Sequence, residues 1–313
     1  LKKSIKKRQR KPPLKINLQK KNKKIKMTNK ETLENIKKLR ELTGVGFKDC
    51  KLAIDENGGD LEKSVDFLRK KGIAKASKKM SRTASEGLVL VHEENNSVSL
   101  IEINSETDFV AKNKDFISFC KEISEINFKV KANLETISKT KMKNGSTVKD
   151  TLVDLIAKIG EKISLRRAKF FDNKNGINFF YVHTQLEKKI GKIVSVVKLS
   201  NIEDKNKDLG NKICMHIAAS NPISLDKNDL DKKIVDKETE IIKEELLNSG
   251  KKEDIIEKIA KGKINKFIDE NTLLNQAWII DPKKKVSEIL KENSVNSQIK
   301  IIDFTRFKVG EGV

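Results

Sequence analysis

The chain has 313 residues, a formal net charge of +22 at pH 7, and 36% hydrophobic and 5% aromatic residues. This length allows two or three small domains, each able to bury a core. No stretch approaches the roughly 18 apolar residues of a membrane span and no hydrophobic signal region begins the chain, so we expect a protein without membrane contact. Cys50, Cys120 and Cys214 form no C-x-x-C pair, which favours reduced thiols and a cytoplasmic location.

Residues 1–26 contain thirteen Lys and Arg and no acidic residue, so the rest of the chain carries 54 basic and 45 acidic groups. Because few apolar residues offset the conformational entropy and the like charges repel, we predict a disordered tail. Three interpretations are open: a non-native extension with Met27 as the true start, which we favour, an organelle transit segment, and an RNA-binding arm. A transit segment should be rich in Arg and Ser, whereas this tail is rich in Lys.

Residues 27–72 predict a small module of three helices. Leucine and isoleucine recur at helical spacing up to Gly44, a glycine pair ends a second helix, and a third helix ends before Gly72. This pattern is typical of the ubiquitin-associated type, whose apolar loop, here with Phe47, faces a partner; the alternative is that Phe47 closes the bundle. Residues 73–85 are small and basic, which predicts a linker helix or an extended connector.

The remainder predicts an α+β core of two antiparallel units, each a sheet covered by a helix. Residues 86–145 show a strand pair and then a helix, and residues 146–225 show a helix, three strands and a further helix. Residues 226–271 are highly charged and predict a protruding hairpin of two helices that touch along a narrow seam. Residues 272–313 are expected to return to the core through a short helix and a closing strand.

Motifs for catalysis or metal binding are not recognisable in the sequence. The spacings of His92, His183 and His216 match no metal-ligand set. The TGVG at 43–46 follows a helix and lacks the Lys-Ser/Thr of a phosphate loop. We therefore predict a protein that is not an enzyme and has no metal or cofactor of its own.

Asp108 and Phe109 stand side by side in the polar segment between an alternating strand and a helix expected to begin near Lys114. A phenylalanine in this place is either a lid on the local core or a wedge directed at another protein. A wedge needs a large, stiff apolar body, which phenylalanine supplies with few rotatable bonds.

Four segments resemble the bacterial elongation factor Ts family, in this order and at suitable distances: KLRELTGVGFKDCKLAIDENGGDLEKSVDFLRKKG, INSETDFVAKNKDF, CMHIAASNP and IDFTRFKVGEGV. The match extends from about residue 30 to the end of the chain. The resemblance implies a cytoplasmic guanine nucleotide exchange factor that promotes GDP release from elongation factor Tu. The Mg²⁺ and the GDP would belong to that partner.

The resemblance also implies site residues. In the family, the aspartate and phenylalanine of the TDFV block, here Asp108 and Phe109, push against the partner near its Mg²⁺ site and loosen GDP. Since a GTPase holds GDP through backbone amides, a lysine and Mg²⁺, a shift of the elements that order the ion weakens several contacts at once. The further contact positions implied are Phe47, Lys51, Thr107, Val110, Ile190, Gly191, His216, Ile279 and Ile280.

Several alternatives stay open. His216 also fits a core histidine, and Ile279 with Ile280 also fits a buried strand. The chain departs from the family pattern in its Lys-rich head and in stopping at GEGV, where many members continue into a terminal helix, so a truncated end is one expectation. The hairpin corresponds to a coiled-coil insertion that supports homodimers in some members.

A different class of function is an RNA-binding or ribosome-associated protein. The sequence pI near 9.6 suggests it, but most of the excess charge lies in the tail and no RNA motif appears. A third class, an adaptor of the ubiquitin-associated type, would explain residues 30–72 but not the TDFV block.

Overall fold

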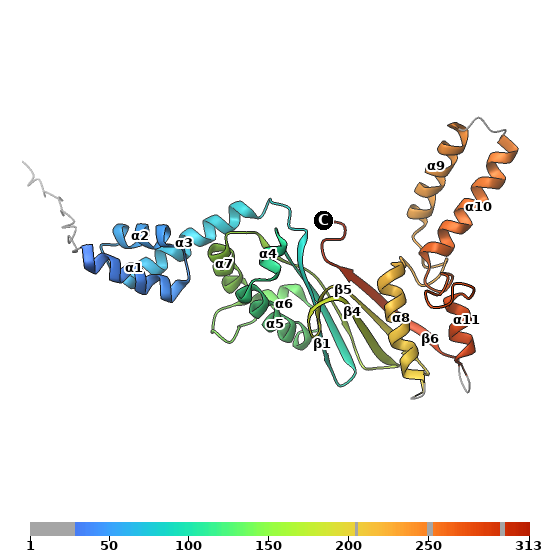
Figure 1. Ribbon diagram of the computed structural model, residues 1–313, viewed down its shortest axis with the longest axis horizontal. Coiled ribbons are helices and arrows are strands. Elements are labelled where there is room, and N and C mark those ends of the chain that lie inside the picture. The colour runs from blue at the N-terminus through green and yellow to red at the C-terminus, as the bar shows by residue number, and fades with distance from the viewer. Residues whose placement is uncertain (1–28, 204–205, 249–252, 295–297) are drawn as a thin grey trace, which may run out of the picture. The chain divides into compact units, whose positions relative to one another are not determined.

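The computed structural model describes residues 29–203, 206–248, 253–294 and 298–313. The predicted tail, residues 1–26, lies outside these described residues. The chain divides into two compact units, Leu1–Leu68 and Arg69–Val313, and each is described by itself (Figure 1).

The first unit contains helices α1 (Asn29–Thr43), α2 (Phe47–Glu56) and the beginning of α3 (Leu61–Lys79). One apolar cluster holds them together, and its buried members are Ile36, Leu39, Cys50, Ala53, Ile54 and Leu68. These residues repeat at the spacing of one helix face, so burial of that face stabilises helices that would be marginal in isolation.

The prediction that the third helix ends before Gly72 is wrong, because α3 continues to Lys79 and takes up part of the expected connector. A Cβ atom at position 72 would lie 3.2 Å from the Cβ of Ala157. The glycine therefore permits a close approach between α3 and the helix that carries Ala157, and it does not act as a terminator.

The second unit contains one antiparallel sheet of six strands in the order β3-β2-β1-β5-β4, with β6 also pairing with β5. The two-residue turn between β1 and β2 consists of Asn95 and Asn96, whose positive φ angles of 48° and 62° suit a tight hairpin. The strands are β1 (Glu86–Glu94), β2 (Ser97–Ser105), β3 (Ile163–Phe171), β4 (Ile177–Glu187), β5 (Ile190–Ser200) and β6 (Lys300–Lys308).

The two predicted halves of the core share this single sheet, and their junction is short. Strand β1 pairs with β5 only at Val89↔Gly191 and Leu90↔Ile190, and β6 pairs with the rest of β5. A Cβ atom at Gly191 would lie 2.6 Å from Cγ1 of Val182, so only glycine allows the strands to approach here.

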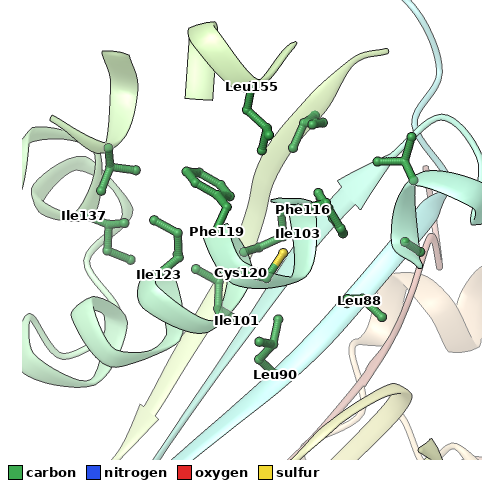
Figure 2. Close-up of a cluster of buried hydrophobic side chains, with 14 of the residues drawn as sticks. Leu88, Leu90, Ile101, Ile103, Phe116, Phe119, Cys120, Ile123, Ile137 and Leu155 are labelled. Atoms are coloured by element: carbon green, nitrogen blue, oxygen red, sulfur yellow. The ribbon is translucent and has the colours of Figure 1, made fainter. Parts of the chain in front are cut away.

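Helices α4 (Asp108–Ala111), α5 (Lys114–Lys129) and α6 (Leu134–Lys139) belong to the first half of the core. Helix α7 (Val148–Ile159) and strand β3 lie in the stretch 146–225 that the sequence assigned to the second half, but they share the apolar cluster of α5 and β2. Figure 2 shows the largest buried cluster, in which Phe116 and Ile123 of α5 lie against Ile101 and Ile103 of β2. The helical spacing on α5 and the alternation on β2 supply the matching apolar faces. Sequence reasoning did not foresee α6, which is only six residues long.

Helices α8 (Lys207–Ser220) and α11 (Val286–Glu292) belong to the second half, where Ile213, Trp278 and Val197 share a second cluster. Helices α9 (Lys232–Asn248) and α10 (Glu253–Asn271) pack on each other through a small cluster of their own. Its buried members are Ile242, Leu246, Ile256 and Ala260.

A buried carboxylate ties the end of the chain to the sheet. Glu102 of β2 is fully buried, and its oxygens accept hydrogen bonds from Arg166 at 2.9 Å, from Arg167 at 2.6 Å and from the backbone N–H of Gly310 at 2.9 Å. Burial alone would raise the pKa of Glu102, but these three donors together hold it below its usual value. The ionised carboxylate thus links β2 and β3 to the segment that follows β6.

Candidate functional site

The Phe109 ring is a tip on the surface of the second unit. Its side chain is 79% exposed. Its neighbours Val110 and Ala111 are only 5% and 2% exposed, and they belong to the apolar cluster that α5 and β2 form. Phe109 is therefore not a lid on its own core. The four-residue helix α4 presents one apolar side chain outward and anchors itself with the next two.

Contacts on both sides of α4 fix where this tip lies. At its start, Thr107 has an extended backbone and gives both its N–H and its hydroxyl to the carboxylate of Glu161, at 3.0 and 2.8 Å. At its end, the side chain of Asn113 caps α5 by accepting the N–H of Phe116 at 3.3 Å. Phe116 itself is fully buried.

Asp108 lies beside the exposed ring and is paired within its own helix turn. Lys112 donates a hydrogen bond to Asp108 at 2.9 Å. This bond, followed by the charges of Lys112 and Lys192, lowers the pKa of Asp108. The tip therefore combines an apolar ring with an ionised carboxylate at neutral pH.

Ile190 and Gly191 lie beneath this region and not on its surface. Both are buried, and Ile190 belongs to the same apolar cluster as Val110. The next residue along β5, Lys192, forms an ion pair with Glu86 at 2.6 Å. The structure thus brings Asp108, Phe109, Ile190 and Gly191 into one neighbourhood although they are far apart in sequence.

His216, Ile279 and Ile280 form a second group. His216 is fully buried, its ring stacks on Trp278 with 5.2 Å between centroids, and its Nε2 lies 2.9 Å from Oε1 of Gln276. The backbone N–H of Ile279 donates to His216 Nδ1 at 3.4 Å, so Nε2 carries the proton that Gln276 accepts. Burial lowers the pKa of His216 and keeps the ring neutral.

Ile279 and Ile280 are exposed by 40% and 57%, so the alternative that they form a buried strand is wrong. His216 occupies the core position that the alternative interpretation gave it. Its imidazole supports the loop that carries the two isoleucines.

In the first unit, Phe47 and Lys51 share one face of α2, four residues apart. Phe47 is 47% exposed and Lys51 is also exposed. Phe47 is absent from the residues that close the three-helix cluster.

Sequence reasoning missed Glu106 and Glu161, the two carboxylates that hold together the ends of β2 and β3 next to the tip. Glu106 accepts the backbone N–H of Lys162 at 2.5 Å, as Glu161 accepts that of Thr107. Continuing the pairing of β2 with β3 beyond Ser105↔Ile163 would have placed Glu106 opposite Lys162 and Thr107 opposite Glu161, but the pairing cannot be read from either strand alone.

The cysteines and the possible metal ligands of the described residues provide no second candidate site. Cys50, Cys120 and Cys214 are buried, and burial raises the pKa of the Cys120 and Cys214 thiols. Over the described ranges of the chain, no group of three or more His, Cys, Asp or Glu could hold a metal ion. No helix in the described part is long and apolar enough to cross a lipid bilayer.

Exposed apolar side chains, one held by the buried His216 imidazole and another by the partly buried Glu161 carboxylate, define an α+β protein whose surface is suited to contact with another protein. The family model for elongation factor TS matches residues 106–311. The elongation factor Ts of Rickettsia prowazekii (strain Madrid E) is 42% identical over 89% of this chain and 91% of its own length. Those of Gluconobacter oxydans (strain 621H) and Methylobacterium sp. (strain 4-46) are 39% and 40% identical, covering 89% and 90% of this chain and 91% and 93% of their own.

The chain belongs to the elongation factor Ts family. Its role is that of a nucleotide exchange factor in translation elongation.

Proposed function

We propose that this chain accelerates GDP release from elongation factor Tu by inserting Phe109 next to the Mg²⁺ and phosphate site of that GTPase. The observation that carries the proposal is the 79% exposure of a phenylalanine on an anchored tip. Burying such a side chain in a partner contributes about 1.5–3 kcal/mol. That free energy is realised only in the complex, so it is available to distort the partner.

Linkage gives the thermodynamic form of the mechanism. If the factor binds nucleotide-free partner more tightly than GDP-bound partner, GDP affinity in the complex must fall by the same ratio. The ionised Asp108 beside the ring brings a carboxylate to the region where the partner orders Mg²⁺, and it competes there for hydrogen bonds and for the ion. The chain supplies no covalent chemistry and no cofactor in this scheme, since Mg²⁺ and GDP belong to the partner.

Other contacts position the two proteins. Helices α1 to α3 would act as a module of the ubiquitin-associated type that docks on the GTPase through Phe47 and Lys51, which are both exposed. Ile279 and Ile280 would supply a separate apolar contact. The buried or partly buried members of the predicted set shape these surfaces from below, and they are Thr107, Val110, Ile190, Gly191 and His216.

The α9–α10 hairpin is the proposed site of a homodimer contact. Ile241 and Leu247 are 43% and 59% exposed beside the seam that joins the two helices. Light scattering on the protein and on an Ile241→Glu, Leu247→Glu variant tests this contact, because a charge at either position would disperse the dimer. If the parent protein is monomeric, the proposed homodimer contact is wrong.

The bacterial cytoplasm is the proposed location, since elongation factor Tu works there. RNA contact through residues 1–26 is the second candidate function, because these residues carry thirteen basic groups and no acid. Deletion of residues 1–26 should abolish salt-dependent retention on RNA and leave GDP release unchanged.

The decisive experiment measures release of a fluorescent GDP from purified elongation factor Tu with and without this protein. We expect release to accelerate in proportion to the factor concentration until the partner saturates. No acceleration would overturn the proposed exchange activity.

A further inference from the structure

The backbone ladder between β2 and β3 ends two residues before α4, and two carboxylates continue it. The last registered pair is Ser105↔Ile163. Beyond it, the N–H of Lys162 donates to Oε1 of Glu106 at 2.5 Å, and the N–H of Thr107 donates to Oε2 of Glu161 at 3.0 Å. Side-chain oxygens thus take the place that carbonyl oxygens hold in the ladder.

The two carboxylates differ in what they hold. Glu106 also accepts Arg82 at 3.2 Å, and Lys162 reaches back to the carbonyl of Arg82 at 2.7 Å, so this group ties the strand ends to the segment after α3. Glu161 faces the tip instead. Its second oxygen accepts the hydroxyl of Thr107 at 2.8 Å, so one carboxylate holds both donors of the residue before Asp108.

The usual local device for starting a helix is absent at α4. Thr107 is its N-cap residue, but its side chain accepts no cap hydrogen bond, and its hydroxyl instead donates to Glu161. A helix of four residues cannot stabilise itself, since nucleation alone is unfavourable. The direction of α4, and with it that of Phe109, therefore depends on the anchors Val110 and Ala111 and on the Glu161 carboxylate.

We propose that Glu161 is a positioning residue for nucleotide exchange, which holds Thr107 so that Phe109 is presented in an ordered conformation. The inference rests on the proposed role of Phe109 in GDP release. A preordered tip spends less of its binding free energy on ordering itself in the complex. Glu161 acts through Thr107 and the tip, without a place of its own among the contact residues.

Amide hydrogen exchange on the free protein tests the structural half of this proposal without any partner. In Glu161→Ala, exchange at residues 107–111 should rise about tenfold or more, because the Thr107 N–H loses its acceptor. Exchange in the α5 core should stay as in the parent protein. Unchanged protection of residues 107–111 would overturn the proposal.

Fluorescent GDP release tests the functional half. Glu161→Ala should lower the second-order rate of release about tenfold, since small misplacements of a contact group are costly. Glu161→Gln should recover to within about threefold, because its amide oxygen accepts the N–H and its NH₂ donates to the hydroxyl oxygen of Thr107. The matched control is Glu122→Ala, which removes a partly buried glutamate that likewise accepts a loop N–H, that of Lys143 at 2.5 Å; it should stay within about twofold.

A double-mutant cycle with Phe109→Ala separates the two proposals. If Glu161 acts through the ring, Glu161→Ala should add less than about twofold in the Phe109→Ala background. An equal loss in both backgrounds, or parent rates for Glu161→Ala alone, would overturn the positioning role and leave the role of Phe109 intact. Parent rates for Phe109→Ala would instead overturn the proposed function and this inference with it.

Discussion

The tip around Phe109 and the loop around Ile279 present apolar side chains by different means. The tip is braced by the partly buried Glu161 carboxylate, whereas the loop is braced by the fully buried, neutral His216 imidazole. A carboxylate near the surface can lose its partner and be solvated by water. A buried imidazole has no access to water. Removal of His216 should therefore lower the free energy of unfolding much more than removal of Glu161.

Removal of the imidazole is expected to have the largest effect on stability. His216→Ala leaves a cavity against Trp278 and an unpaired Gln276 oxygen, so we expect a loss of about 2–4 kcal/mol in the free energy of unfolding. Urea unfolding measures it. Met215→Ala, at an exposed neighbour on the same helix, should change stability by less than about 0.5 kcal/mol. Equal losses in both variants would mean that the buried imidazole stabilises the fold no more than an exposed side chain does.

Truncation of the ring is expected to affect exchange and not folding. Phe109→Ala should slow GDP release by roughly 30-fold, which corresponds to about 2 kcal/mol for a hot-spot residue. Its unfolding free energy should stay near that of the parent, because the ring is 79% exposed. Ile302→Ala, at an exposed residue of β6, serves as the control. A folding defect without a rate defect would show that the ring is structural.

A smaller effect is expected at the loop surface. Ile280→Ala should weaken binding to nucleotide-free elongation factor Tu by about fivefold, or about 1 kcal/mol, while leaving stability unchanged. Binding kinetics on immobilised partner would measure it, with Ile223→Ala as a control of similar exposure. Equal affinities in parent and variant would mean that the exposed loop residue makes no contact.

The smallest effect concerns the carboxylate that ties the end of the chain to the sheet. Because the folded pKa of Glu102 is lowered, its contribution to stability is full above the unfolded pKa of about 4.3 and is lost as pH falls through the folded pKa. The free energy of unfolding should therefore decline below about pH 4.5. In Glu102→Gln the decline should be shallower, and an identical slope in both proteins would contradict this assignment.

Local pattern was enough to predict most elements of the fold. Alternation in β1 and β2 and the apolar spacing on α5 are properties of neighbouring residues, and the structure has these elements where they were expected. The failures occurred where a distant contact overrides the local signal. Gly72 fails to end α3 because it packs against Ala157, far along the chain.

The candidate site shows the same division between sequence and structure. Local pattern left open whether Phe109 is a lid or a wedge, although the family resemblance favoured the wedge. The pairing of Thr107 with Glu161 joins residues 54 positions apart. A propensity or a periodicity cannot report such a contact, since it depends on which strands become neighbours.

By itself, the sequence determined the α+β class, most of the strands and helices and the membership of the elongation factor Ts family, because these follow from local periodicity and from ordered motifs. Only the tertiary structure decided that Phe109 lies outside while Val110 and His216 lie inside. The physical reason is that exposure is a property of the packed chain: a side chain stays in solvent only when its neighbours fill the core and satisfy the backbone beneath it.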